Sequence, residues 1–523
     1  MTQDVSTTDT HRRLFYQVLA ITTLIKLWLA LAIPLTGDEA YFYQWGKHLD
    51  WGGYYDHPPM AGWILWLLQQ FSSNLLVLRL PAILLWIVIT LGMMDLLDRL
   101  SPAAAGKRWL LGSLFLALPF TWSLNLITTD TPLVFFLFFS GYALIRAEGA
   151  DDVADDVAGD VANAVPNTVP NALANQLGWY AASGVLLGLA LLSKYFAGLL
   201  AIAYAVYFLP RRGGWWRLLV IALCALPFML LNLAWNTTHC WNNFLFNLIN
   251  RNQGAHFTLK HLGVYVAMVI YLVTPWTTWQ IVKIKSWRND WRLTSLFVVP
   301  FVLFLLLSFY KSIGLHWVLA FLPFVFLFAG LHISEASLTQ HRRWAVWLSI
   351  PHMLALALIA HLPSDYFKSL KIHQDIVMHR EAPALITMLK EGMPDNGTLM
   401  TQSYSGASLL AFHAQTYVPV FGAGSFHARF DDNITDFRTF EGRTLRIVST
   451  KRLLAENFTA YFDDVQIKEL KLDGASFWMA EGRGFHFEPY YERVLKRIAE
   501  TYYRVPSYLP LRGCRFLEQY GFI

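Results

Sequence analysis

The sequence has 523 residues, of which 55% are hydrophobic and only 15% charged, a balance that excludes an ordinary soluble enzyme of this size. The formal net charge of +5 comes largely from Lys/Arg clusters between apolar runs, which indicates membrane orientation rather than nucleic-acid binding. The three cysteines, Cys224, Cys240 and Cys514, lack the spacing of a metal site, and a disulfide between Cys240 and Cys514 is left open.

Apolar runs long enough to cross a bilayer recur from Leu14 to Leu362. The first run is too long, and too poor in small residues, for a cleavable signal, so we expect it to stay as an anchor with a cytoplasmic N-terminus. Positive-inside counting predicts about eleven spans and places the C-terminal region outside. The predicted spans lie near residues 14–35, 75–98, 109–125, 131–147, 178–192, 196–210, 218–236, 261–281, 293–309, 317–335 and 344–362.

The fifth and sixth spans decide which side the C-terminus occupies. Residues 177–210 are apolar except for Ser193 and Lys194. One helix of this length would extend about 50 Å and would place Arg211 and Arg212 outside, against the charge rule. The sequence therefore predicts two short spans hinged at Lys194, an interruption of the kind at which membrane proteins build sites. One long tilted helix with a snorkelling lysine is the alternative.

Two regions differ in composition from the spans. The segment 148–177 is rich in Asp, Val, Ala and Asn, and we expect it to be a disordered cytoplasmic linker. After residue 362 polar residues increase, and alternation such as that of 444–448 predicts strands. The expected domains are a transmembrane domain over 1–362, with juxtamembrane helices in the external loop 36–74, and a small extracytoplasmic α/β domain over 363–523.

Ionisable side chains gather at the outer surface of the predicted topology. They are Asp38, Glu39, His57, Asp130, Lys194, Lys311 and His316. Ionisable groups close to hydrocarbon cost a few kcal/mol each unless they are paired or solvated, so their convergence from distant positions indicates a functional site. Each residue alone also has a plainer explanation, as a helix cap, a turn residue or an interfacial anchor.

Five motifs occur in a fixed order along the chain. They are Gly37-Asp38-Glu39-Ala40, His57-Pro58-Pro59, Thr129-Asp130-Thr131-Pro132, Leu192-Ser193-Lys194-Tyr195 and Tyr310-Lys311-Ser312. As an ordered set they resemble the bacterial protein mannosyltransferase-like family of C-type membrane glycosyltransferases, which includes the lipid A aminoarabinose transferases. The resemblance implies a polytopic α-helical membrane protein that moves a sugar from a polyprenyl-phosphate carrier to an acceptor on the outer face of the cytoplasmic, or inner, membrane. The acceptor would be lipid A or lipopolysaccharide, another glycan, a lipid or a protein.

The resemblance also implies roles for individual residues. The family's catalytic acid in the first external loop maps onto Asp38, and its donor-phosphate lysines map onto Lys194 and Lys311. The aminoarabinose transferases carry lysine before the Pro-Pro pair, where this chain has His57. This departure predicts pH-dependent phosphate binding and weakens any claim that the substrate is the same.

The expected chemistry agrees with these residue types. An acceptor hydroxyl that displaces a phosphate from an anomeric carbon needs a base, for which Asp38 is the candidate. Fixed cations at Lys194, Lys311 and His57 would stabilise the departing lipid phosphate. The residues expected to bind or orient the substrates are Glu39, Asp130, His316 and Tyr55. The chemistry requires no cofactor and we assign no metal ligand, although Glu39 and Asp130 leave participation of a divalent cation open.

The main rival is a transporter or flippase of lipid-linked glycans, because intramembrane acids and broken spans also mark transport paths. The two halves of the sequence show no evident repeat, and the charges gather at one predicted surface rather than along the membrane depth. A non-catalytic scaffold, or a phosphatase or ligase acting on polyprenyl carriers, is also left open. The donated sugar and the acceptor are not decided by the sequence.

Overall fold

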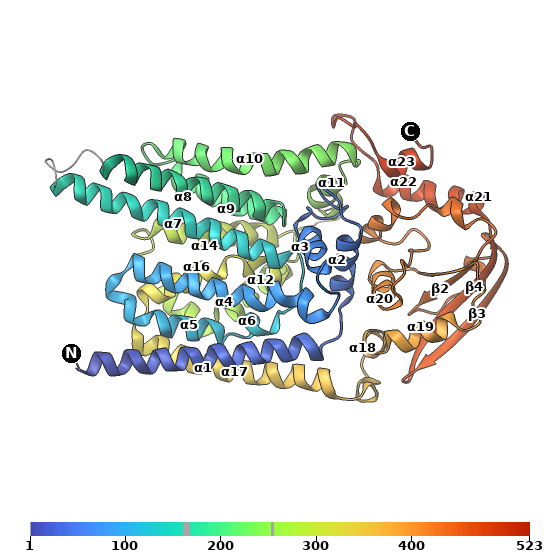
Figure 1. The fold of residues 1–523 in the computed structure, drawn as a ribbon, viewed down its shortest axis with the longest axis horizontal. Helices are drawn as coiled ribbons and strands as arrows, with labels where there is room; N and C mark the ends of the chain where they lie inside the picture. The colour runs from blue at the N-terminus through green and yellow to red at the C-terminus, as the bar shows by residue number, and fades with distance from the viewer. Residues whose placement is uncertain (1, 161–167, 253–255) are drawn as a thin grey trace. The chain divides into compact units, whose positions relative to one another are not determined.

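The computed structural model describes residues 2–160, 168–252 and 256–523, and these form two compact units. Unit 1 is built from Met1–Leu31, Leu76–Leu231 and Asn252–Ala357, and unit 2 from Ala32–Leu75, Asn232–Arg251 and Leu358–Ile523. Unit 2 thus gathers three segments that are far apart in the sequence (Figure 1). The loop 36–74, which we expected in the transmembrane domain, packs here with the C-terminal residues.

Unit 1 is helical, and its helices pack through large apolar side chains such as Phe115, Phe138 and Phe328, all of which are fully buried. Its elements are α1 (Thr2–Ala32), α4 (Leu75–Leu100), η1 (Pro102–Lys107), α5 (Arg108–Leu116), α6 (Pro119–Ser123), α7 (Asp130–Asp160), α8 (Thr168–Leu191), η2 (Tyr195–Ala197), α9 (Gly198–Phe208), α10 (Gly214–Thr238), α12 (Leu259–Val273), α13 (Pro275–Lys283), α14 (Trp291–Ser308), α15 (Leu315–Leu319), α16 (Leu322–His332) and α17 (Glu335–His361). Single terminal residues of α1 and α4 and longer ends of α10 and α17 belong to unit 2.

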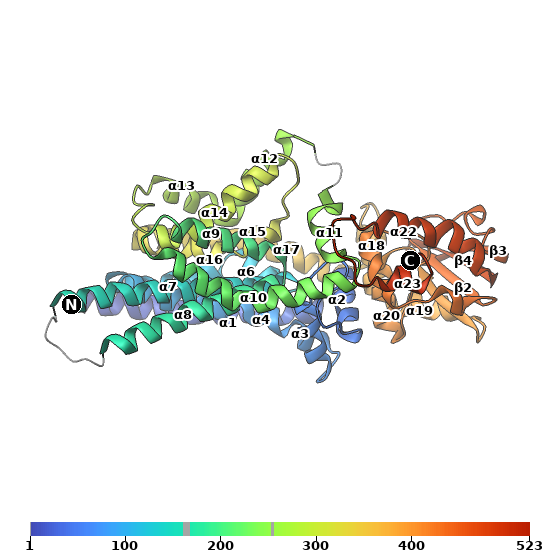
Figure 2. The same ribbon diagram turned by 90° about the horizontal axis from the view of Figure 1, so that it is seen from above.

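Within the described residues, six helices are long and apolar enough to cross a membrane, and a bent pair would make a seventh. The six are Thr8–Ala32, Leu75–Leu100, Asp130–Gly149, Gly214–Thr238, Trp291–Ser308 and Glu335–His361. The bent pair is α12 and α13, which meet at 93° (Figure 2) because Thr274 has a left-handed backbone and Pro275 starts a new helix. The prediction of a polytopic helical membrane protein is confirmed, while the count of eleven spans stays a prediction.

The chain turns back at Lys194. Helix α8 ends at Leu191, Lys194 has an extended backbone, and η2 starts at Tyr195. Side chains on the two sides of the turn meet, since the hydroxyls of Ser183 and Tyr204 are 3.3 Å apart. The predicted interruption at Lys194 is therefore confirmed.

The segment 148–177, expected to be a disordered cytoplasmic linker, contains the ends of two helices, and its disorder stays a prediction. Helix α7 continues to Asp160 and α8 starts at Thr168, so both ends of the segment 148–177 are helical. Residues 161–167 lie outside the described part of the chain. Extension of an existing helix avoids the cost of nucleation, and the repeated alanines favour helix. Neither helix extension nor alanine propensity is contained in the overall composition of the segment.

Unit 2 contains a four-stranded mixed sheet in the order β1-β2-β4-β3. Strands β1 and β2 are parallel and the other neighbours antiparallel, so the small α/β fold expected from the C-terminal sequence is present. The elements of unit 2 are α2 (Gly37–Lys47), α3 (Met60–Gln69), α11 (Asn242–Leu248), η4 (Ser364–Phe367), α18 (His373–Arg380), α19 (Ala382–Lys390), β1 (Gly397–Thr401), α20 (Tyr404–Ala414), η5 (Phe426–Asn433), η6 (Phe437–Phe440), β2 (Thr444–Ser449), η7 (Ala455–Asn457), β3 (Phe462–Leu472), β4 (Ala475–Phe485), α21 (Phe487–Tyr490), η8 (Tyr491–Leu495), α22 (Lys496–Tyr502) and α23 (Arg515–Gln519), with η3 (Asn250–Asn252) at the boundary with unit 1.

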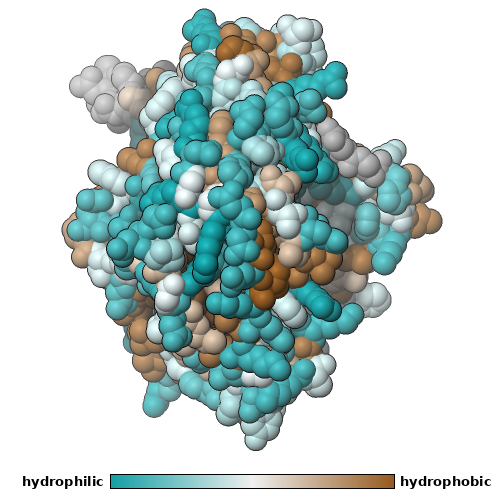
Figure 3. All heavy atoms as spheres, turned by 90° about the vertical axis from the view of Figure 1, so that its right-hand side faces the viewer, coloured by the Kyte–Doolittle hydropathy of each residue, from teal (hydrophilic) through white to brown (hydrophobic). Residues whose placement is uncertain are grey.

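Unit 2 exposes many polar side chains. Most of the face drawn in Figure 3 is hydrophilic, with apolar patches between the polar side chains. The edge strand β3 carries several charged residues, including the exposed Asp463, Asp464 and Lys468. Charges on an edge strand discourage pairing with other chains and are favourable in water. This surface is typical of a domain that faces water rather than lipid.

A disulfide joins Cys240 to Cys514, which are 274 positions apart in the sequence and have their Cα atoms 4.8 Å apart. Backbone hydrogen bonds continue the connection, because Cys240 N donates to Gly513 O and Arg512 N donates to Thr237 O. The middle and the C-terminal segments of unit 2 are therefore fastened together. The pairing that the sequence left open is present.

Removal of this disulfide is expected to destabilise unit 2. A cross-link over a long loop restricts the unfolded chain and typically contributes about 2–4 kcal/mol. The Cys514→Ser variant should therefore unfold at a lower temperature than the wild type in detergent, as followed by circular dichroism. The control is Cys224→Ser, which removes the unpaired cysteine. Equal melting temperatures of Cys514→Ser and the wild type would contradict the expectation.

Candidate functional site

The first external segment begins with a well-formed helix cap. Thr36 accepts a hydrogen bond from the backbone N of Glu39, and the Glu39 carboxylate accepts one from the backbone N of Thr36, at 3.3 and 3.2 Å respectively. This capping box fixes the first turn of α2. Asp38 lies in that turn, where the helix dipole favours negative charge. The side chain of Asp38 is exposed.

The C-terminal segment supplies a hydrogen-bond donor to Asp38. Tyr404, the first residue of α20, donates its hydroxyl to Asp38 Oδ1 at 3.2 Å. Its ring packs edge-to-face on Tyr41, with 5.0 Å between the ring centroids. Burial and then the neighbouring carboxylate of Asp38 raise the pKa of Tyr404 well above its usual range, so the phenol keeps its proton and acts as a donor. A residue 366 positions away in the sequence thus orients one oxygen of Asp38.

A second carboxylate, Asp56, is almost completely buried beside this pair. Its Oδ2 is 2.7 Å from His427 Nδ1, and its Oδ1 accepts a hydrogen bond of 3.3 Å from the hydroxyl of Tyr41. Burial alone would raise the pKa of Asp56, but His57 and His427 outweigh burial and lower it. Burial would lower the pKa of His427, but the hydrogen bond and charge of Asp56 raise it overall. The two groups therefore favour the charged pair.

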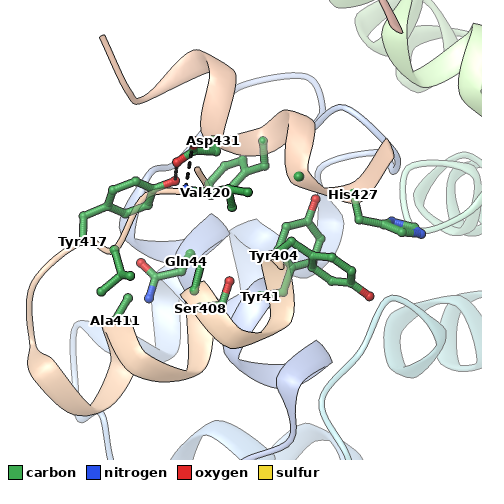
Figure 4. Close-up of a pocket in the computed structure, with 13 residues that line it drawn as sticks. Tyr41, Gln44, Tyr404, Ser408, Ala411, Tyr417, Val420, His427 and Asp431 are labelled. Carbon is green, nitrogen blue, oxygen red and sulfur yellow. Dashed lines mark hydrogen bonds between the residues drawn. The ribbon is translucent and has the colours of Figure 1, made fainter. Parts of the chain in front are cut away.

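Figure 4 shows the small pocket beside these residues, which Tyr41, Tyr404, Tyr417 and Asp431 help to line. Its volume of about 10 Å³ is room for one water molecule at most, so a sugar does not fit in it. Asp431 accepts hydrogen bonds from the Tyr417 hydroxyl and the Val420 backbone N, and burial raises its pKa to about 6. The pocket is thus a packed part of unit 2 that supports the exposed residues at its rim.

Three further residues singled out from the sequence have structural contacts in unit 2. Glu39 is 1% exposed and belongs to the helix cap. Tyr55 is fully buried and donates its hydroxyl to the backbone O of Tyr502 at 3.1 Å. His57 is mostly buried, packs near the Trp45 ring, and hydrogen-bonds the backbone O of Asp56 through Nδ1. Their predicted contacts with substrates remain untested predictions.

In unit 1 the hinge lysine meets the acid at the start of α7. Lys194 Nζ donates to both carboxylate oxygens of Asp130, at 2.8 and 3.1 Å, and the Lys194 side chain is only 7% exposed. His316 Nε2 lies 4.0 Å from Asp130 Oδ2. The structure therefore brings together three residues that the sequence placed at one membrane surface, from α7, the α8–η2 turn and α15.

Lys311 joins this cluster through two aromatic rings. Its ammonium lies 5.9 Å from the Trp317 ring, while that of Lys194 lies 5.6 Å from the Phe196 ring. The centroids of these two rings are 4.3 Å apart. Lys311 also donates a hydrogen bond of 2.8 Å to Asn252 Oδ1. Two lysines thus flank one aromatic pair. Together with a protonated His316 they would carry more positive charge than the single carboxylate of Asp130 neutralises.

The cluster of Asp130, Lys194, Lys311 and His316 is suited to an anion. Lysine ammonium groups are compact donors for phosphate oxygens, and low exposure strengthens their electrostatic attraction. Asp130 holds Lys194 in place rather than presenting an unengaged carboxylate to a sugar. In the described ranges 2–160, 168–252 and 256–523, no group of three or more His, Cys, Asp or Glu side chains is arranged to hold a metal ion.

Sequence reasoning missed two residues that contact the predicted base or its neighbours, Tyr404 and His427. Both lie in the C-terminal segment, which shows no motif at these positions. Asp56 directly precedes the His57-Pro58-Pro59 motif. Its adjacency to the motif was the one available signal.

Comparison with known proteins supports the resemblance inferred from the motifs. Residues 56–155 match the family model described as dolichyl-phosphate-mannose-protein mannosyltransferase. Crystal structures of ArnT from Cupriavidus metallidurans superpose with TM-scores of 0.57 in the apo state and 0.59 bound to undecaprenyl phosphate. The chain has the fold of ArnT. The sequence identity is 14%, and the match covers 89% of this chain and 97% of the ArnT chain.

The predicted resemblance to this group of membrane glycosyltransferases is therefore confirmed, and the ArnT-like fold extends over most of the chain. A search of curated proteins found no significant match. The family model covers Asp56 and Asp130 but ends before Lys194 and begins after Asp38. The roles of the individual residues in this chain thus depend on their own geometry.

The His427–Asp56 pair predicts a pH-dependent stability. The pKa of His427 is raised in the folded state. Its contribution to the free energy of unfolding is therefore fully present below the usual value of 6.5 and is lost as pH rises through the raised pKa. For Asp56, with its lowered pKa, the contribution is lost only in acid, as pH falls below the usual 3.8. The difference in melting temperature between the wild type and His427→Gln should therefore be larger at pH 6 than at pH 9, by roughly 2–4 °C.

This comparison is made by differential scanning fluorimetry in detergent, with His486→Gln as the control. His486 forms a similar hydrogen bond of 2.7 Å to Asp463, but that pair is exposed and contributes little. A difference between the wild type and His427→Gln that is the same at both pH values would contradict the assigned pairing.

Proposed function

We propose that the protein is a glycosyltransferase that moves a sugar from a polyprenyl-phosphate carrier to an acceptor. The observation that carries the proposal is the contact of Lys194 and His316 with Asp130, to which Lys311 is connected through the Phe196–Trp317 ring pair. These side chains provide cations for a lipid phosphate inside an ArnT-like fold. One of the ArnT structures with this fold contains undecaprenyl phosphate. The donated sugar is a hexose or a pentose.

Asp38 is proposed as the base that deprotonates the acceptor hydroxyl. It is exposed, and Tyr404 engages its Oδ1 while the described residues offer no hydrogen bond to Oδ2. A carboxylate with one oxygen fixed and one available can accept a proton with a defined orientation. If the acceptor reacts through a phosphate, which needs no base, Asp38 positions that acceptor instead. Lipid A or lipopolysaccharide, another glycan, a lipid and a protein are all compatible acceptors.

Lys194 and Lys311 are proposed to bind the phosphate of the donor and to stabilise its charge as the bond to the sugar breaks. Leaving-group charge is best met by cations that are already in place, because no reorganisation is then needed during reaction. Asp130 supports this by orienting Lys194, and His316 adds charge when protonated. His57 remains a proposed contact of the donor in this scheme, with Glu39 and Tyr55 as residues that shape the acceptor side. We assign no metal ligand in this scheme, and participation of a divalent cation is left open.

We also propose that the protein lies in the cytoplasmic membrane of a bacterium with unit 2 on the extracytoplasmic side. The disulfide between Cys240 and Cys514 supports this orientation, because disulfides persist in oxidising compartments. The polar surface of unit 2 is consistent with an aqueous environment. The N-terminus is then cytoplasmic by the positive-inside rule.

Transport of a lipid-linked glycan is the rival function. A transporter needs polar groups along the path through the membrane. In unit 1 the cluster of Asp130 and Lys194 joins the beginning of α7 to the turn after α8, which are ends of helices rather than their middles. A terminal position favours chemistry at one surface over passage across the membrane.

Substitution of Asp38 by Asn is expected to abolish sugar transfer to a hydroxyl acceptor, with a loss of about 10²–10⁴-fold. The purified protein in lipid is given polyprenyl-phosphate sugars, and release of polyprenyl phosphate is followed by mass spectrometry. Asp365→Asn is the matched control, because Asp365 is an exposed acid of unit 2 paired with Lys368. Equal turnover by Asp38→Asn and wild type would refute the role of Asp38 while leaving the transferase activity in place.

Substitution of Lys194 or Lys311 by Ala is expected to weaken binding of undecaprenyl phosphate by at least about tenfold, which corresponds to about 1.4 kcal/mol. The measurement is a titration of the purified protein with the lipid phosphate, read out by intrinsic tryptophan fluorescence. Lys260→Ala, which removes an exposed lysine at the start of α12, is the control. Unchanged affinity in both lysine variants would place the phosphate elsewhere.

A further inference from the structure

The buried Asp56 and the half-exposed His427 form a carboxylate–histidine pair that the proposed reaction has not yet used. Asp56 Oδ2 and His427 Nδ1 are 2.7 Å apart, and the side chains are 1% and 39% exposed, respectively. Burying the carboxylate of Asp56 costs free energy unless it is paired, and a purely structural contact at this position would not need a charge. The pair therefore deserves a chemical explanation.

The hydrogen bond defines which nitrogen carries the proton. The pKa of Asp56 is lowered, because His57 and His427 outweigh the effect of burial, so its carboxylate can only accept. His427 Nδ1 must then carry a hydrogen in both protonation states of the ring, so the proton that His427 gains or loses is the one on Nε2. The described residues place no hydrogen-bond partner at Nε2. Figure 4 shows the imidazole at the rim of the small pocket and pointing away from it.

The pair lies next to the residues that hold the proposed base. The His427 ring is 5.0 Å from the Tyr404 ring, centroid to centroid, and Tyr404 is the donor to Asp38. Tyr41 makes an edge contact with the same tyrosine and donates to Asp56. One aromatic contact therefore joins Asp38 and His427 within unit 2.

The charges around His427 come from several elements of unit 2. Asp56 and the more distant Asp38 favour its protonated form, whereas burial and Arg251 oppose it. His57 acts on the partner Asp56. The carboxylates prevail, so that His427 is a stronger base than an ordinary histidine. This direction suits a group that receives a proton near neutral pH.

We propose that His427, oriented by Asp56, is a second proton acceptor of the glycosyl transfer reaction, so that the proton taken from the acceptor hydroxyl ends on Nε2. This inference rests on the proposed function. Asp56 is then a positioning residue, which fixes the tautomer of His427 as the carboxylate does in a Ser-His-Asp triad. The proposal concerns acceptors that react through a hydroxyl.

The proton and the electrons balance in this scheme. The acceptor oxygen forms a bond to the anomeric carbon as its hydrogen passes to Asp38, and the bond from that carbon to the phosphate oxygen breaks with its electron pair on the phosphate. Asp38 then passes the proton to Nε2 of His427 through a water molecule, and Asp38 is regenerated as a carboxylate. The imidazolium finally releases the proton to water. No oxidant or reductant is needed.

A purely structural role would give a different pattern. If His427 only filled space and paired with Asp56, its substitution would lower stability and leave the pH dependence of transfer unchanged. If it accepts the proton, the acid side of the pH–rate profile of the wild type reports its protonation, above the ordinary value of 6.5. Without the His427 imidazole, the acid side of the pH–rate profile reports protonation of the Asp38 carboxylate instead.

The test compares transfer by the full-length protein in lipid vesicles over pH 5–9 with a polyprenyl-phosphate sugar that the wild type turns over. The variants are His427→Gln, whose amide can still donate to Asp56, and Asp56→Asn, whose amide would donate to Nδ1 and move the hydrogen to Nε2. His486→Gln is the matched control, since His486 makes a hydrogen bond of the same length to Asp463. Melting temperatures show that each variant is folded.

We expect both variants to lose about 10²-fold in kcat at pH 7 with little change in KM for the donor, while His486→Gln equals the wild type. The acid limb of the pH profile of kcat should move to lower pH in His427→Gln. The double variant should be no slower than the slower of the two single variants, because the two residues act as a unit. A folded His427→Gln with the wild-type pH profile and kcat would overturn this inference alone. Lack of turnover by the wild type with every donor would instead overturn the proposed function.

Discussion

A charge next to hydrocarbon is costly unless it is paired or hydrogen-bonded, and this constraint determines where the polar groups of unit 1 lie. Lys194 is almost buried because Asp130 compensates it with two hydrogen bonds. On α7 the carboxylate of Glu148 accepts hydrogen bonds from the hydroxyls of Tyr180 and Tyr207. Each buried charge is held in one geometry by its partners. A fixed cation is also what a phosphate site requires, so the same pairing serves stability and function.

Unit 2 satisfies a different requirement, because it must assemble from three segments of the chain. The disulfide between Cys240 and Cys514 and the pairing of Asp56 with His427 each join two of these segments. The contact of Tyr404 with Asp38 does the same. The hydrogen bonds that orient the proposed base are therefore also bonds that hold the first external segment to the C-terminal residues. Loss of either partner is expected to affect folding as well as chemistry, which is why folded, conservative variants are needed.

The sequence was informative where a local physical rule applied. The break at Lys194 followed from the excess length of one helix, and strand β2 (Thr444–Ser449) from alternation. The acid Asp38 stood out because it follows directly after an apolar span. The roles of Tyr404 and His427 depend on contacts with residues more than 360 positions away, for which a single sequence carries no periodic or compositional signal. The helical ends of the linker were missed because composition does not include helix extension from a neighbouring span.

The central claim is that the protein breaks the bond between a sugar and a lipid phosphate rather than carrying the intact molecule across a membrane. The most direct measurement is mass spectrometry of the lipids in sealed vesicles that contain the purified protein, a polyprenyl-phosphate sugar and a candidate acceptor extract. Free polyprenyl phosphate, formed together with a glycosylated acceptor and absent with nucleotide sugars as donors, is the predicted result. Movement of the intact polyprenyl-phosphate sugar between leaflets, with no polyprenyl phosphate released, would contradict it.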